Sequence, residues 1–368
     1  MKQLIIFCCL FLSVQFSLFS QADTEFWFAV PYVTKYHAGG KPAYLRISAK
    51  SATTVQISQP ANNTPQAFDT VFNMPANTTV SIDLTSYLGI LTDSFPNQKG
   101  DNAIYIKSTN LISAYYEFSA NTNAEVFVLK GNENALGTEF YTPFQNTWDT
   151  DQNPEYKSPA DPGWYRGDAH STIDIVATED NTQITIIPKA NGVDNINNAI
   201  TQRPAGVAYT VSLNRGQTYT LQAATISKMD HLFGTHITTN NKKIAVTIKD
   251  DTVKEGEGIP GRVAGDLIGT LDYGYDLIGD QIVPTNIVGA DYIVLKGFTG
   301  FNKTGVKDKV FIIVTENNTK LTVNGVSQPS VYQKGDTVSF KTGILGDAVY
   351  ISARDAGNAN VKKNIYVY

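Results

Sequence analysis

Apolar and polar residues alternate over many short stretches of this chain, and Gly, Asn and Pro interrupt the alternation about every ten residues. A period of two is typical of strands that bury one face. After residue 22, no segment keeps the 3.6-residue spacing of an amphipathic helix. The pattern therefore predicts an all-β protein built from β-sandwich or barrel-like units.

One strand–turn–strand pattern recurs along the chain without a gap. Residues 175–188 and 312–323 share a β-branched run, a Thr-Glu pair, an Asn-containing turn and a second alternating run, and residues 48–57 are a looser copy. The pattern is that of a hairpin, with Asn181 and Asn318 at turn positions that tolerate a positive φ.

Two further elements follow each copy. A turn residue leads into an alternating strand, and two strands joined by a polar connection then close the unit. The first element is expected at Asn77–Ile82, Gly216–Leu221 and Gly335–Phe340, and the second at 100–116, 234–248 and 346–368. Internal repetition of this kind predicts three tandem units, either independent or packed as one pseudo-symmetric body.

The unit boundaries follow from similar starting motifs. Thr24–Trp27 resembles Thr138–Tyr141, and Gly279–Pro284 is a looser third copy. We assign the units to residues 23–136, 137–277 and 278–368, with insertions in the middle unit at about 146–170 and 189–206. The sequence stops at Tyr368 inside an alternating strand, and we expect it to be a fragment of a longer protein.

Residues 1–22 have the features of a secretory signal peptide. Lys2 supplies a positive charge, an apolar stretch follows from Leu4 to Phe19, and Ser20-Gln21-Ala22 offers small residues for cleavage. Both cysteines, Cys8 and Cys9, lie in this segment. The mature protein is therefore expected to be secreted, extracellular or at the cell surface, without disulfides or thiol chemistry.

Composition excludes some classes of function. The net charge is −5 with 17% charged residues, and no basic run is present, so the electrostatic footprint of a nucleic-acid binder is missing. No later apolar segment is long enough for a membrane span in the mature chain. These features favour a partner that is a protein or a glycan.

An ordered series of motifs also runs through the chain. Its members are Phe26–Pro31, Leu129–Gly131, Ala135–Tyr141, Ile175–Asp180, Leu213–Tyr219, Ile244–Thr247 with Asp250-Asp251, and Asp276–Gln281. The series resembles the N-terminal domain of the IgG Fc-binding protein family, found in a mucus-associated protein of animals and in bacterial secreted or surface proteins. The resemblance implies an extracellular, non-enzymatic interaction module, and it supplies no catalytic residue set.

The first candidate site is the insertion before residue 171, which is rich in Pro, Gly and Asp. Aromatic and Arg side chains on a polar loop suit sugar stacking or a protein interface. Long loops in compact domains often carry function, although this loop could equally fold back and bury its own aromatics. The predicted ligand-binding residues are Trp148, Tyr156, Trp164, Tyr165 and Arg166.

The second candidate site is the acidic stretch Lys249–Gly258. The stretch contains Asp250, Asp251, Glu255 and Glu257, the last two alternating with glycines, and a loop of this kind can wrap a calcium ion. The spacing matches no EF-hand, and a solvated acidic loop is the alternative. No other cofactor is indicated.

Enzyme motifs are missing. Four histidines are present, without H-E-x-x-H, G-x-S-x-G or a phosphate-cradling glycine loop. A carbohydrate-active enzyme would need paired carboxylates such as Glu117 and Glu139. We therefore expect a binding or adhesion module that acts through loops, with a structural block of a surface appendage or matrix as the alternative and a carbohydrate-active enzyme as the third hypothesis.

Overall fold

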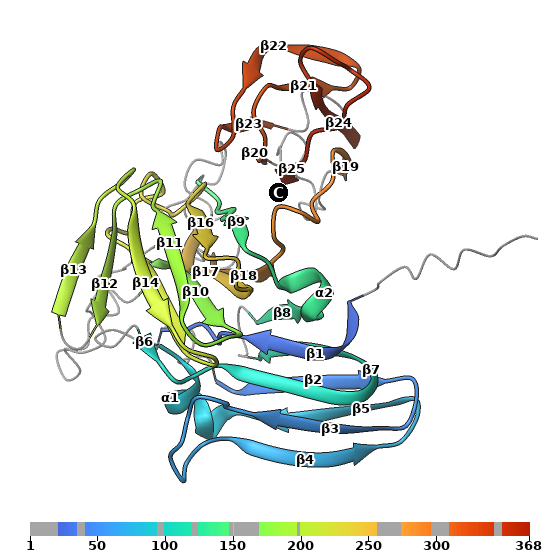
Figure 1. Ribbon diagram of the computed structural model, residues 1–368, viewed down its shortest axis with the longest axis vertical. Helices are drawn as coiled ribbons and strands as arrows, with labels where there is room; N and C mark the ends of the chain where they lie inside the picture. The colour runs from blue at the N-terminus through green and yellow to red at the C-terminus, as the bar shows by residue number, and fades with distance from the viewer. Residues whose placement is uncertain are drawn as a thin grey trace, which may run out of the picture.

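The computed structural model describes residues 21–34, 41–93, 99–119, 124–146, 150, 169–196, 199–255, 274–295, 309–341 and 348–368. These residues form an all-β protein, as predicted, with 25 strands and three short helical segments (Figure 1). The predicted signal peptide lies outside the described residues, apart from Gln21 and Ala22. Within the described ranges, no helix is long and apolar enough to cross a membrane.

Most strands fall into three sets in chain order. The first set contains β1 (Ala22–Phe28), β2 (Ala43–Ala49), β3 (Thr53–Ser58), β4 (Asp69–Met74), β5 (Thr78–Asp83) and β7 (Ile104–Phe118). The middle set contains β9 (Glu139–Tyr141), β10 (Ser171–Ala177), β11 (Thr182–Ile187), β14 (Tyr209–Leu213), β15 (Thr218–Ala223), β16 (His236–Thr239) and β17 (Ile244–Glu255). The third set contains β19 (Asp291–Leu295), β20 (Lys309–Val314), β21 (Thr319–Val323), β22 (Val326–Tyr332), β23 (Thr337–Lys341), β24 (Ala348–Asp355) and β25 (Ile365–Val367).

The remaining elements connect or extend these sets. β8 (Glu125–Leu129) pairs with β7, and β18 (Gly274–Ile282) pairs with β17. The predicted insertion at 189–206 forms β12 (Gly192–Ile196) and β13 (Ala199–Arg203), which extend the sheet of β15. The other elements are η2 (Thr85–Tyr87), α1 (Leu88–Leu91), β6 (Lys99–Gly100) and α2 (Gly131–Ala135).

The three sets share one strand topology. In one layer of the first set, the central strand β2 lies between β5 and β7. In the same layer of the other two sets, β10 lies between β15 and β17, and β20 lies between β23 and β25. In the other layer of the first set, β3 lies between β4 and β7, and β1 pairs with β7. In the middle set β11 lies between β14 and β16, and β9 pairs with β16. In the third set β21 lies between β22 and β24, and β19 pairs with β24. In the first set the 15-residue β7 serves both layers.

The repeated strand–turn–strand segments are arches between layers, not the hairpins that the sequence predicts. β10 pairs with β15 and β17 in one sheet, whereas β11 pairs with β14 and β16 in the other. Alternating residues of both strands, such as Ile175 and Ile184, meet in one core. The sequence pattern is the same for a hairpin and an arch, because both require one buried face per strand.

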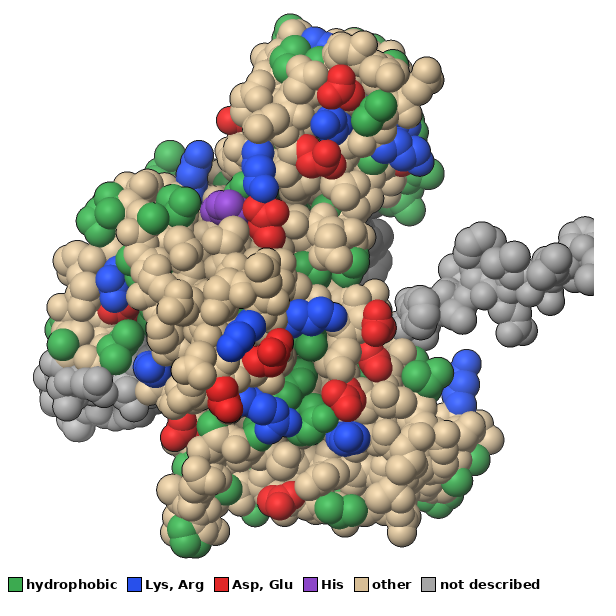
Figure 2. All heavy atoms as spheres, viewed as in Figure 1, with side chains coloured by type: hydrophobic (Ala, Val, Ile, Leu, Met, Phe, Trp, Pro, Cys, Tyr) green, Lys and Arg blue, Asp and Glu red, His purple; other side chains and the backbone are tan. Residues whose placement is uncertain are grey.

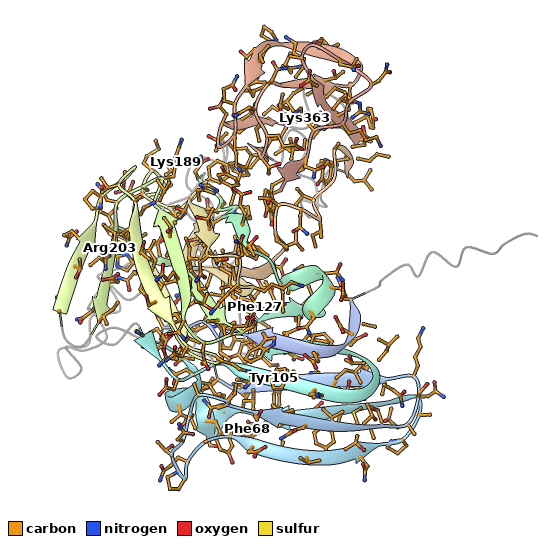
Figure 3. All side chains as sticks on the ribbon, viewed as in Figure 1. Phe68, Tyr105, Phe127, Lys189, Arg203 and Lys363 are labelled. Atoms are coloured by element: carbon orange, nitrogen blue, oxygen red, sulfur yellow. The ribbon has the colours of Figure 1, made fainter. Side chains whose placement is uncertain are left out.

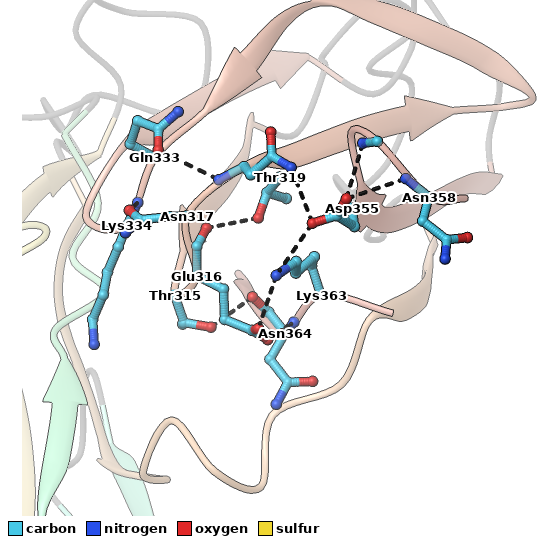
Figure 4. Close-up of polar contacts among 12 residues, drawn as sticks. Thr315, Glu316, Asn317, Thr319, Gln333, Lys334, Asp355, Asn358, Lys363 and Asn364 are labelled. Atoms are coloured by element: carbon cyan, nitrogen blue, oxygen red, sulfur yellow. Dashed lines mark hydrogen bonds and ion pairs between the residues drawn. The ribbon is translucent and has the colours of Figure 1, made fainter. Parts of the chain in front are cut away.

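The turns of the arches have the predicted backbone conformation. Asn181 has φ 55° and Asn318 has φ 60°. Thr182 Oγ1 donates to the Glu179 carbonyl over 2.7 Å, and Thr319 Oγ1 donates to the Glu316 carbonyl over the same distance. Figure 4 shows this turn in the third set with its neighbouring ion pairs.

A second turn, before β5, β15 and β23, is also common to the sets. Its left-handed residue is Asn77, Gly216 or Gly335, with φ 57°, 80° and 88°. Gly216 N–H donates to the Ala177 carbonyl and Gly335 N–H to the Val314 carbonyl, both over 2.8 Å. We propose that the three sets are the repeated units of the sequence, with the third beginning after β18 and not at residue 278.

The first and middle sets pack through β8 and β18. Gln281 of β18, fully buried, donates to the Trp27 carbonyl over 2.7 Å and accepts from Lys130 N–H over 2.8 Å. Lys130 Nζ lies 2.6 Å from the Asp280 carboxylate. The ring of Phe127, labelled in Figure 3, lies against Gly279. A small apolar cluster of Trp27, Ala29, Ala103, Leu136, Val176 and Ala245 lies between the two sets.

The third set packs on the middle one through aromatic side chains. Phe311, Ile313 and Tyr366 belong to the apolar core of the middle set. Phe311 meets Phe233 edge to face, with ring centroids 5.5 Å apart. The third set also has a smaller core of its own, centred on Ile312, Leu321 and Ile351.

The substitution Gly279→Ala tests the packing of β18 on β8. A Cβ at this position collides with the Phe127 ring, so we expect unfolding to become easier by about 1–3 kcal/mol. Urea unfolding of the mature chain measures the change. Gly89→Ala in α1, where an added Cβ meets no atom within 4 Å, is the matched control and should be neutral or stabilising. Equal stability of both variants would contradict the described contact.

Candidate functional site

Three segments that are distant in the sequence are anchored at the C-terminal end of β17. Thr34 N–H donates to Asp251 Oδ2 over 2.9 Å, and Thr150 forms a bridge with Val253. Thr150 N–H also donates to the Ile226 carbonyl over 2.8 Å. The chain continues from these anchors into residues 35–40, 151–168 and 256–273, which lie outside the described residues. We call this region the loop-anchor end.

A buried polar network holds the loop-anchor end together. The Asp250 carboxylate accepts from Gln145 Nε2 over 2.8 Å and lies 3.0 Å from His231 Nδ1. His231 Nε2 lies 3.3 Å from Thr150 Oγ1. The side chains of Asp250 and His231 are almost completely buried, so their mutual contacts replace water. Buried polar groups that satisfy each other fix one conformation of the segments that carry them.

A second polar network lies on the opposite face of β17, because successive strand residues point to opposite sides. Asp251 and Lys249 lie on this face, 3.6 Å apart, and both are fully buried. Asp251 also holds the backbone of Thr34. The face continues across β10 and β15 with Asp174, Thr172 and Thr220.

Two carboxyl groups in this region have raised pKa values. Burial raises the pKa of Asp93 to about 7 and that of Asp174 to about 6. Asp93 accepts from Asn102 Nδ2 over 2.6 Å, and Asp174 accepts from Thr220 Oγ1 over 2.6 Å and Thr172 Oγ1 over 2.9 Å. Raised carboxyl pKa values in a polar interior are typical of functional sites and also of structural networks.

The predicted ligand-binding residues Trp148, Tyr156, Trp164, Tyr165 and Arg166 all lie outside the described residues. The structure does describe the flanks of their segment. Gln145 and Thr150 lie on either side of Trp148 and belong to the Asp250 network, and the buried His170 follows the segment directly before β10. The predicted ligand loop and the predicted acidic stretch are therefore anchored at the same end of the middle set.

The predicted metal residues do not form one group among the described residues. Residues 249–255 belong to β17, so this part of the acidic stretch is a strand and not the expected loop. Asp250 and Asp251 point to opposite faces and accept from protein donors. The Glu255 side chain and Glu257 lie outside what is described. Within the described residues no three His, Asp or Glu side chains could hold a metal ion, and calcium stays an untested prediction.

The carboxylates of the enzyme hypothesis lie in separate ion pairs. Glu117 in β7 pairs with Arg46, and the hydrogen bond from Arg46 lowers the Glu117 pKa. Glu139 in β9 lies 2.6 Å from both His236 Nε2 and Lys334 Nζ, and the bond with His236 is the largest cause that lowers its pKa to about 2. A general acid needs a raised pKa, so neither group has the property of one.

Sequence reasoning missed His231, Asp93 and Asp174. Asp174 stands between Ile173 and Ile175 in an alternating strand, where the pattern predicts an exposed side chain. All seven residues of β10 are buried instead. The available signal was one charged residue in a strand that is otherwise strongly apolar. A strand with one face in solvent gives the same signal.

Comparison with known proteins supplies a family. A sequence model of the family described as IgGFc binding protein matches residues 125–368, about two thirds of the chain. The chain belongs to the IgGFc-binding protein family. The family match covers the middle and third sets and begins at β8. Searches of curated proteins and of solved structures found no match.

Within this member of the IgGFc-binding family, charged side chains also line the boundary of the first and middle sets (Figure 2). Arg215 lies over the Trp27 ring at 4.9 Å, and Gln217 Nε2 donates to Asp101 over 2.9 Å. These contacts add to the apolar cluster around Trp27. The family description is that of a binding protein, in agreement with the expected class of function.

Asp93→Asn tests the polar interior by its pH dependence. The folded pKa of Asp93, about 7, exceeds its ordinary value of 3.8, so between these values folding takes up a proton and stability falls as pH rises. The variant should be more stable than the natural chain at pH 8, by about 1–3 kcal/mol, and similar at pH 4. Urea unfolding at both pH values measures this, with exposed Asp69→Asn as control. Equal differences at both pH values would contradict the burial of a titrating Asp93.

Asp250→Ala tests the anchoring network. The change removes the buried carboxylate that Gln145 Nε2 and His231 Nδ1 contact, so unfolding should become easier by about 1–3 kcal/mol. The amide of Thr150 should exchange with solvent faster than in the natural chain, because its segment loses a fixed neighbour. Hydrogen exchange with mass spectrometry measures both effects, and Asp69→Ala is the control. Unchanged exchange at Thr150 would show that Asp250 does not hold this segment.

Proposed function

We propose that the protein is an extracellular protein-binding module whose ligand surface is formed by the segments that leave the loop-anchor end. The observation that carries this proposal is the convergence of Thr34, Thr150 and Glu255 at the end of one strand. Segments that start from one rigid edge can contact a single ligand together. Membership of the IgGFc-binding family supports a protein ligand.

The energetic reason for this arrangement is preorganisation. Binding costs free energy when loops become ordered, and anchoring both flanks of a loop reduces that cost. The segment between Thr150 and His170 contains Trp164, Tyr165 and Arg166, the residue types that most often dominate binding energy. The buried Asp250 network would then act as the fixed base of the binding surface.

The first candidate ligand is the Fc part of immunoglobulin G, because the family description names it. A glycan remains the second candidate, since Trp and Tyr rings also stack on sugars. Secretion and exposure at a cell surface are part of the proposal and are supported by the signal-like residues 1–22. Adhesion is the biological role that fits such a surface.

A second candidate function is a structural block of an appendage or matrix. The observation that favours it is the recurring contact between successive sets. Arg215, in the second turn of the middle set, covers Trp27 of the first set, and Lys334, in the same turn of the third set, pairs with Glu139 of the middle set. The same turn thus contacts the preceding set at both junctions, and an interface that repeats along a chain allows extension by further units.

Binding of purified Fc to the immobilised mature chain tests the proposal. We expect saturable binding that falls at least about tenfold in the double variant with Trp164→Ala and Tyr165→Ala, because truncated aromatic anchors typically cost 2 kcal/mol or more. Val207→Ser, at an exposed apolar position away from β17, is the control and should bind normally.

The same measurement is repeated with Fab fragments and a glycan panel. Binding to a glycan but not to Fc, with the same loss in the double variant, would support the site and change the ligand. Absence of saturable binding to any of these probes would contradict the binding proposal and favour the structural block.

A further inference from the structure

One side of the first set is formed by the edge strands of both its layers, β4 and β5. β4 lies at the bottom of the view in Figure 1, beyond β3. Among the described strands, β4 pairs only with β3, and β5 pairs only with β2. We call the side formed by β4 and β5 the open side of the first set.

The apolar core of the first set extends to this open side. Phe72 of β4, and Val80 and Ile82 of β5, pack against the core but are only partly buried. In the middle set the strand equivalent to β5 is β15, and β12 and β13 extend the sheet beyond it. Within the described residues, no strand extends β5 in this way.

β4 also lacks the features that usually protect an edge strand, which are Lys, Pro and β-bulges. Its equivalent in the third set, β22, contains Pro329, and the register of β22 with β21 shifts. Its equivalent in the middle set, β14, has a lysine beside it, because Lys99 Nζ donates to the Ser212 carbonyl over 3.0 Å. β4 pairs with β3 without a shift, and its one charged residue, Asp69, stands at its end.

The free backbone groups of β4 belong to alternate residues. Gln59 N–H donates to the Phe68 carbonyl over 3.1 Å, so Phe68 directs its hydrogen-bonding groups toward β3. In an antiparallel ladder this direction alternates along the strand. Asp69, Val71 and Asn73 therefore direct their N–H and C=O groups toward the open side.

The edge of β4 is complementary to itself. When two copies of β4 lie antiparallel with Val71 opposite Val71, each Asp69 lies opposite Asn73 of the other strand. The outward N–H and C=O groups of all three residues then meet those of the partner. Asn73 Oδ1 already accepts from Thr54 Oγ1 over 2.7 Å, which leaves the Asn73 amide group to donate to the partner's carboxylate. Val71, now 61% exposed, gains an apolar neighbour.

We propose that the open side of the first set binds a second copy of this chain through antiparallel pairing of β4 with β4. The pairing joins the two β4 layers into one continuous sheet around a two-fold axis at Val71. Phe72 of each copy then lies opposite Thr70 of the other, on the inner face. Strands of this length make a small interface, so we expect a weak dimer that dissociates on dilution.

The open side and the loop-anchor end belong to different sets, so this dimer does not depend on the proposed ligand surface. Two copies joined at β4 carry two loop-anchor ends. A multivalent ligand that reaches both ends binds more tightly than one that reaches a single end, without any new contact.

Sedimentation equilibrium of the mature chain over about 1–200 µM tests the proposal, because a weak dimer changes the average mass in this range. Val71→Lys and Val71→Glu each place two like charges opposite each other at the axis. Each variant alone should dimerise about tenfold more weakly, because like charges directly opposite are destabilising and the apolar pair is lost. An equimolar mixture of the two variants should dimerise as the natural chain does, since opposite charges then face each other.

Leu111→Lys is the matched control. Leu111 is also 61% exposed and lies in β7, which β3 separates from the edge of β4, so this variant should dimerise normally. Val71→Pro removes an outward N–H without a bond to β3 and should also weaken the dimer about tenfold. Circular dichroism checks that each variant is folded.

A natural chain that stays monomeric over the whole range overturns the proposal. A dimer that both charged variants retain at full strength, or that their mixture fails to restore, overturns it as well. Because Asp69 lies in β4, the unfolding and exchange measurements that use it as a control are made at about 1 µM, below the range in which a weak dimer forms.

Discussion

The rest of the structure depends on one constraint, which is that the last strand of a set pairs with a strand from the segment that follows that set. An antiparallel sheet leaves N–H and C=O groups unpaired along its last strand, and such an edge attracts another strand. In this chain β8 fills the edge of β7, and β18 fills the edge of β17. Because each filling strand leads directly into the next set, sheet completion also fixes where that set lies.

This constraint explains why a strongly polar surface can be buried in the middle set. The outer face of β10, β15 and β17 carries Asp174, Thr220 and Lys249, which would ordinarily face water. The first set packs against part of this face through Trp27, and Asp93 adds a further carboxyl group. Burial of these groups raises the free energy of their charged forms, and hydrogen bonds offset only part of that cost. The loop-anchor end is built on the same strand, so its geometry depends on the same packing.

The alternation of residues along the chain was sufficient to predict strands, and the Asn and Gly positions between them indicated the common turns. The family was indicated by the resemblance of an ordered series of motifs. Asn181 and Asn318 have the positive φ that their turns require, and Gly216 and Gly335 occupy equivalent positions. The alternation could not distinguish an arch from a hairpin at β10 and β11. It indicates only which face of each strand is buried, and not which strands pair with each other. The similar motifs predict the third start at Gly279–Pro284, whereas we propose β19 at Asp291 for that position, because of its pairing with β24.

The candidate site was predictable only in part. Its acidic and aromatic segments were identified by composition, but their shared anchoring requires contacts between residues more than eighty positions apart, such as His231 with Gln145. Both are ordinary polar residues in the sequence, and no local pattern marks them as partners. Tertiary packing decides such contacts, since strands that are distant in the chain become neighbours only when the sheets form.

Native-state hydrogen exchange at increasing denaturant tests the central claim most directly, because it measures the opening free energy of each protected amide. If β8 and β18 unite the first and middle sets, the amides of β2, β7, β10 and β17 should share one opening free energy and merge at the same denaturant concentration. Two separate groups, with β2 and β7 exchanging independently of β10 and β17, would contradict the claim that completion of one sheet by the next segment holds this protein together.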